Sequence, residues 1–166
     1  MSEVYLGNPN LKKANTPIQF TEEQVIEFLK CKEDPVYFAN NYIKIVSLDE
    51  GLTQFHPYHF QEKLINNFHE NRFNICKMPR QTGKSTTVVS YLLHYAVFND
   101  SVNIGILANK AATARELLQR LQTAYENLPK WMQQGIISWN KGSMELENGS
   151  KILAASTSAS AVRGMS

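Results

Sequence analysis

The stretch Met78–Thr86 has the sequence MPRQTGKST, and the rest of the chain is best interpreted outward from it. An apolar segment of alternating pattern precedes it at 72–78, and an amphipathic run follows it at 84–98. A strand, a tight loop and a helix in that order direct backbone N–H groups and the positive end of a helix dipole at one point, which suits a phosphate group. The stretch therefore predicts a phosphate-binding loop between a strand at 72–78 and a helix at 84–98.

The last residues of the stretch have the side chains that such a loop uses. Gly83 allows the backbone to approach a phosphate, and Lys84 is expected to reach the β- and γ-phosphate oxygens of ATP. The hydroxyl of Ser85 is expected to complete the shell of a Mg²⁺ ion, and Thr86 adds a second hydroxyl nearer the α-phosphate. The sequence thus predicts ATP and Mg²⁺ as cofactors.

The first part of the stretch departs from the common motif G-x-x-x-x-G-K-[ST], because Met78 stands where the first glycine is expected. Gly-Lys-Ser alone is weak evidence, and its position between a strand and a helix carries the interpretation. Gln81 and Thr82 complete the predicted nucleotide contact. Arg80 is a second cation that can stabilise charge developing on the γ-phosphate, as an arginine finger in cis does. The alternative is an arginine paired with a nearby carboxylate.

The region before the loop is predicted to be helical. Residues 1–20 have little periodicity and indicate an extended arm that lies on another surface or is loose. Apolar spacing and caps predict helices at 21–31, from Asp34 onward, and at 57–70. We expect residues 21–70 to form a small helical subdomain over the adenine side of the site.

The region after the loop alternates between strand and helix. A nearly all-apolar strand at 102–108, of the kind covered by helices on both faces, precedes a helix at 110–127. This order predicts an α/β fold with a parallel sheet, in the three-layer arrangement of P-loop NTPases. Segments 143–146 and 151–155 flank an Asn-Gly pair, which predicts a hairpin.

Composition sets further limits. The chain has 166 residues, 43% of them hydrophobic, and 17 Lys and Arg against 15 Asp and Glu, so net charge argues neither for nor against nucleic acid. Cys31 and Cys76 fit no metal or redox spacing, which favours reduced, buried thiols in the cytoplasm. No signal peptide or membrane span is evident, so no membrane partner is expected. His56 and His59 have a spacing that a metal site can use, but a solvated helix end is favoured.

Several stretches together resemble one protein family. The loop with arginine and glutamine before x-Gly-Lys-Ser, the absent leading glycine and an upstream aromatic-glutamine pair are similar to the large terminase subunit of T-even-type tailed bacteriophages. The likeness extends over nearly the whole chain, through NPNLK (8–12), YFA (37–39), GILA (105–108), WNKGS (139–143), ENGS (147–150) and AVRG (161–164).

The resemblance implies roles for single residues. Gln61, preceded by Phe60, takes the place of the glutamine that recognises adenine, since one carboxamide can both accept from and donate to the base edge. Without the resemblance, a surface glutamine is the favoured interpretation. Arg80 becomes the loop arginine that senses the γ-phosphate. Arg163 matches an arginine that acts in trans on a neighbouring subunit's nucleotide, although an Arg-Gly pair is commonly just a loop.

The family function implied is ATP-driven packaging of double-stranded DNA into a procapsid in the host cytoplasm. The implied partners are DNA, the portal protein, the small terminase subunit and further copies in a ring on the portal. Residues 71–166 would be the ATPase core. In the family an Asp-Glu strand and a nuclease domain follow the position of Arg163, and neither occurs in these 166 residues. Because that pair supplies a metal ligand and the general base, we expect very slow hydrolysis by this chain alone.

Two other classes share parts of the pattern. A superfamily-2 helicase or restriction translocase also has a glutamine motif and Gly-Lys-Ser/Thr. A nucleotide-binding module that does not hydrolyse ATP is the second alternative.

Overall fold

A computed structural model describes residues 3–47 and 49–157 of the protein. Within that range a 3-10 turn (Tyr5–Gly7) is followed by helices α1 (Glu22–Glu33), α2 (Pro35–Tyr42), α3 (His59–Glu70), α4 (Lys84–Phe98) and α5 (Ala111–Glu126). The strands are β1 (Lys44–Ser47), β2 (Gly51–Gln54), β3 (Asn103–Ala108), β4 (Ile136–Trp139), β5 (Ser143–Leu146) and β6 (Lys151–Ser156). The fold class is α/β with mixed sheets, and the predicted helices are confirmed.

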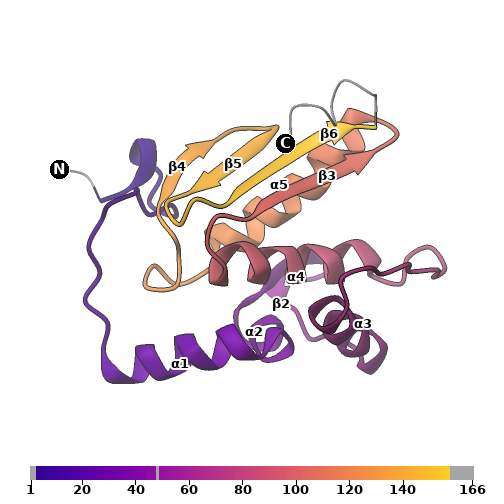
Figure 1. The fold of residues 1–166 in the computed structure, drawn as a ribbon, viewed down its shortest axis with the longest axis horizontal. Helices are drawn as coiled ribbons and strands as arrows, with labels where there is room; N and C mark the ends of the chain where they lie inside the picture. Colours follow the sequence, from indigo (N-terminus) through magenta and orange to yellow (C-terminus); the bar gives the residue numbers. More distant parts are fainter. Residues whose placement is uncertain (1–2, 48, 158–166) are drawn as a thin grey trace.

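The larger sheet has the strand order β3-β6-β5-β4 (Figure 1). β3 and β6 are parallel, whereas β5 pairs antiparallel with both β6 and β4. The predicted hairpin is confirmed, with Gly149 at φ 82° in its turn, a backbone region that glycine adopts without steric cost. The sequence did not predict the β1–β2 hairpin or β4.

Helix α5 covers one face of this sheet (Figure 1). Ile104 and Ile106 of β3 are buried on one face at 7% and 6% exposure, while Leu107, which points the other way, is 41% exposed. The prediction from the apolar sequence, that helices cover both faces of this strand, is therefore wrong for the described residues. An apolar strand indicates that both faces can be buried, but the burial itself depends on which helices pack there.

The strand predicted at 72–78 is also absent from the structure. Residues 73–79 have no regular secondary structure, and Phe73 and Ile75 are 83% and 100% exposed. Alternating apolar residues suit a strand, but a strand exists only where a neighbour accepts and donates its ladder hydrogen bonds. Among the described strands none pairs with this segment. Cys76 is consequently exposed, so the expectation of two buried thiols holds only for Cys31.

Helix α4 is the centre of the helical half of the molecule. It packs against α5 on the side of the sheet and against α2 and α3 on the other (Figure 1). The contact with α2 includes an edge-to-face pair between Phe38 and Phe98, with ring centroids 5.3 Å apart. The predicted caps are confirmed: Thr21 and Gln24 form a capping box, and Asp34 accepts hydrogen bonds from the first amides of α2.

The N-terminal arm is tied to the sheet. Leu11 is 2% exposed, and the Lys12 ammonium lies 2.8 Å from a carboxylate oxygen of Glu147. The buried Gln133 side chain accepts from the Lys12 amide and donates to the Asn10 carbonyl. The surface on which residues 3–15 lie is thus the protein's own sheet. Of the helices that the structure describes, none has both the length and the apolar character needed to cross a membrane.

Candidate functional site

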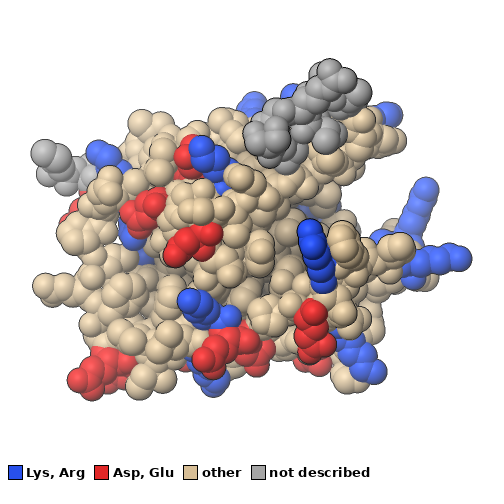
Figure 2. All heavy atoms as spheres, viewed as in Figure 1, with Lys and Arg blue, Asp and Glu red and all other residues tan. Residues whose placement is uncertain are grey.

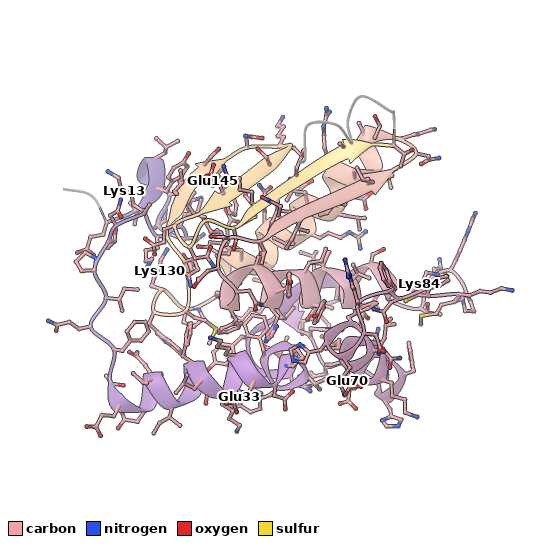
Figure 3. All side chains as sticks on the ribbon, viewed as in Figure 1. Lys13, Glu33, Glu70, Lys84, Lys130 and Glu145 are labelled. Carbon is pink, nitrogen blue, oxygen red and sulfur yellow. The ribbon has the colours of Figure 1, made fainter. Side chains whose placement is uncertain are left out.

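The loop 79–83 enters α4 at the end of the molecule where Figure 3 labels Lys84. Gln81 and Gly83 both have left-handed backbone conformations, with φ of 62° and 73°. Gly83 is also the N-cap of α4, whose first turn carries no acidic residue. Loop residues of alternating handedness direct successive N–H groups into a concave anion site, and the helix dipole reinforces it. The left-handed residues and the helix start at Gly83 are compatible with the predicted phosphate-binding loop.

The Lys84 side chain connects the start of α4 to the first residues of this loop. Its ammonium donates hydrogen bonds to the carbonyls of Met78 at 2.7 Å and Pro79 at 2.6 Å. The Thr82 hydroxyl donates to the same Pro79 carbonyl at 3.0 Å. Hydrogen bonds from an ammonium to an anionic oxygen are stronger than those to a neutral carbonyl. A phosphate in the loop would therefore compete well for the Lys84 side chain.

Gln61 lies behind the loop and is 4% exposed. Its carboxamide oxygen accepts from the Tyr58 amide at 2.9 Å, and its nitrogen donates to the Thr82 carbonyl at 3.3 Å. A Cβ on Gly83 would overlap that nitrogen. Gln61 thus connects the start of α3 to the loop, a structural role that sequence reasoning missed. The motif spacing gave no signal for it, because 21 residues separate Gln61 from Thr82.

The other predicted residues lie around the loop. Arg80, Gln81 and Ser85 are exposed, and Thr86 is half-buried in the first turn of α4. Among the ion pairs of the described residues, none involves Arg80, which does not support a carboxylate-paired arginine. Figure 2 shows Lys and Arg side chains projecting from this end of the molecule. Arg163 lies outside the described residues.

The described residues near the loop do not form a metal site by themselves. Within residues 3–47 and 49–157, no group of three or more His, Cys, Asp or Glu side chains is placed to hold one. His56 is exposed, and His59 Nδ1 lies 3.5 Å from a Glu62 oxygen at the start of α3. A magnesium ion here would depend on ligands brought by a nucleotide.

A cavity of about 490 Å³ opens beside the first turns of α4. It lies between β1, α4 and α5, and Thr86 and Val89 contribute to its wall. A second cavity, of about 430 Å³, lies between α1, the arm and the loop 131–134, away from Lys84. Of these two cavities, only the first is lined by residues of α4, Thr86 and Val89.

A comparison with protein families shows which family the chain is similar to. A family model described as "Terminase large subunit, T4likevirus-type, N-terminal" matches residues 75–166, more than half of the chain. The chain belongs to this family. The resemblance inferred from the sequence motifs is thereby confirmed. The part that matches the terminase family contains the loop, α4, α5 and the larger sheet, whereas Gln61 lies before its first residue.

Proposed function

We propose that this member of the terminase family binds ATP with Mg²⁺ at the loop 79–83 and is part of the ATPase motor that packages double-stranded DNA into a procapsid. The observation that carries the proposal is the position of Lys84 at the start of α4. Its ammonium contacts the carbonyl of Met78, and the loop before it contains left-handed backbone conformations at Gln81 and Gly83. The exchange of its two carbonyl contacts for phosphate oxygens would place one positive charge between the β- and γ-phosphates.

The neighbouring residues support the same ligand. The loop amides and the α4 dipole together stabilise the negative charge of the triphosphate. Ser85 is exposed at the second position of α4, where its hydroxyl would be one ligand of a magnesium ion otherwise held by phosphates and water. Magnesium supplies neutralisation of the phosphate charge. Arg80, exposed in the loop, is the cation available for the γ-phosphate.

The wider assignment rests on the family. Terminase membership supports the P-loop NTPase fold, the portal protein and small terminase subunit as partners, and a ring of copies on the portal. It also supports action in the host cytoplasm on the procapsid, with Arg163 reaching a neighbouring subunit's nucleotide. These parts of the proposal extend beyond the loop geometry.

The loop proposal is tested by titrating the 166-residue chain with MgATP and following backbone amide resonances. We expect amides 80–85 to shift, and Lys84→Ala to weaken binding at least tenfold. Lys63→Ala, at an exposed lysine of α3, is the matched control and should bind as the parent does. Unmoved loop amides, or equal affinity of the Lys84→Ala protein, would refute ATP binding at this loop.

A further inference from the structure

Helix α1 carries a row of apolar side chains that are about half exposed or more. Val25, Ile26 and Leu29 are 46%, 67% and 52% exposed, and residues three and four positions apart share one face of a helix. Figure 1 shows α1 along the edge of the molecule farthest from the larger sheet. The capping box at Thr21 fixes the start of the helix, so the row has a defined geometry. Contiguous exposed apolar side chains of this kind mark an interaction surface.

The cavity of about 430 Å³ adjoins this row. Val25 and Leu29 contribute to its wall, together with Phe20 of the arm, which is itself 45% exposed. Lys12 and Glu147 line the cavity as well, and they form an ion pair at 2.8 Å, so the polar lining carries no net charge. An apolar wall with a neutralised polar part suits an uncharged apolar side chain. The row therefore has beside it a space that an apolar side chain of another molecule can enter.

The charges of α1 differ between its two ends. The first turn carries Glu22 and Glu23, and the last turn carries Lys30, Lys32 and Glu33. Among the ion pairs of the described residues, none includes any of these five side chains. Two copies of α1 that pack antiparallel bring the acidic end of one copy against the mainly basic end of the other, whereas parallel packing brings like charges together. The charge pattern therefore favours a second copy of this chain, in antiparallel orientation, as the occupant of the surface.

We propose that α1 is a self-association surface, through which two copies of the chain pack antiparallel with Ile26 of each copy against Val25 and Leu29 of the other. Ile26 is the most exposed of the three, and the cavity beside Val25 and Leu29 leaves room for it. A contact that uses the same patch on both partners is isologous and closes with two copies. It is thus separate from the ring of copies proposed above, and it does not depend on nucleotide binding.

The small size of the surface predicts a weak dimer. A helix of 12 residues is about 18 Å long at 1.5 Å per residue, so one such face falls short of the roughly 800 Å² per partner of a standard interface. We expect a dissociation constant between about 1 μM and 1 mM. Sedimentation equilibrium of the intact chain over this range of concentrations should show monomers and dimers. A monomer at every concentration would overturn the proposal.

The first variant places a charge in the centre of the contact. Ile26→Glu should weaken dimerisation at least tenfold, and it should fold as the parent does because the side chain is exposed. Val46→Glu is the matched control, since Val46 is also β-branched, is 71% exposed and lies on β1. Undiminished association of the Ile26→Glu protein, or equal weakening by both variants, would exclude α1 as the contact.

Charge reversal tests the partner without changing the apolar row. A protein with Glu22→Lys and Glu23→Lys, and a second protein with Lys30→Glu and Lys32→Glu, each bring like charges together in an antiparallel pair. Each alone should dimerise at least fivefold more weakly than the parent, whereas an equal mixture should form a heterodimer with at least the parental affinity. Added salt should weaken that heterodimer, because salt screens exposed charges. A mixture that associates no better than either variant alone would refute the pairing of opposite ends.

Disulfide crosslinking tests the orientation, in chains that also carry Cys76→Ser. Position 26 lies near the two-fold axis of the proposed pair, so Ile26→Cys should crosslink two copies rapidly. Antiparallel packing separates the two copies of position 22, so Glu22→Cys should crosslink at least tenfold more slowly. Equally rapid crosslinking at position 22 would indicate a parallel pair and overturn the antiparallel contact.

Discussion

The carboxamide nitrogen of Gln61 occupies the space in which a side chain on residue 83 would begin. The same nitrogen donates to the carbonyl of Thr82, one residue earlier. Gly83 is thus required for two reasons: its φ of 73° disfavours other residues, and the Gln61 side chain leaves no room for a Cβ. The loop and α3 are fitted to each other at this point.

This contact predicts the behaviour of Gly83→Ala. The added methyl group displaces Gln61 and strains the backbone, so we expect MgATP affinity to fall at least tenfold and stability to fall by about 1–3 kcal/mol. Adding Gln61→Ala removes the overlap but not the strain in φ, so the double variant should regain part of the stability. Urea unfolding measures both effects. Equal stability of the single and double variants would show that the overlap has no energetic consequence.

The sequence predicted the local elements well because their causes are local. The capping box at Thr21, the Asn148-Gly149 turn and the start of α4 at Lys84 each depend on residues within a few positions. The prediction of a strand at 72–78 was wrong because a strand also needs a neighbouring strand to pair with, and none of the described strands pairs with this segment. In the site, the motif identified Lys84, which lies inside the loop. It could not show that Gln61 supports Thr82, since that contact is set by the packing of α3 on α4.

The lowered pKa of the buried His94 predicts that the folded protein loses stability in mild acid. Burial lowers the pKa of His94 from 6.5 to about 4, despite the hydrogen bond between its Nε2 and the Cys31 carbonyl. The unfolded chain therefore takes up a proton near pH 6.5, while the folded chain does so only near pH 4. The contribution of the neutral His94 to the free energy of unfolding is complete above pH 6.5. It decreases as the pH falls toward 4, by on the order of 2–3 kcal/mol.

Urea unfolding between pH 7 and pH 4 checks this prediction. His94→Leu should flatten the dependence on pH, whatever its effect at pH 7. His59→Gln, at an exposed histidine at the start of α3, should keep the slope of the parent. An unchanged slope in the His94→Leu protein would assign the acid sensitivity to other groups.

The two thiols should react very differently. Burial, together with the nearby Glu27 carboxylate, raises the pKa of Cys31 to about 12, whereas Cys76 is exposed in the segment before the loop. Because the thiolate is the reactive form, a disulfide reagent at pH 8 should modify one thiol rapidly in the folded chain. Cys76→Ser should abolish that fast phase, and Cys31→Ser should leave it intact. Two fast thiols in the folded parent would contradict the burial of Cys31.

The arm gives the last prediction, through Lys12 and Glu147. Desolvation works against ionisation of Glu147, but the Lys12 ammonium and the amides of Gly135 and Asn15 outweigh it and hold the pKa of Glu147 below its ordinary value. Glu147→Gln weakens these contacts and should cost about 1–3 kcal/mol. Since the pKa is depressed in the folded state, this contribution is present at neutral pH and is lost as the pH falls below the ordinary range of a carboxyl group.

A double-mutant cycle with Lys12→Met measures the pair itself, and Lys151→Met with Glu145→Gln is the matched control because that ion pair is more exposed. We expect a coupling energy for Lys12 and Glu147 at least twice that of the control pair, and faster proteolysis of residues 3–15 in the Glu147→Gln protein. Equal coupling in the two cycles, or an arm that stays protected without the carboxylate, would show that Gln133 and Leu11 hold the arm without this ion pair.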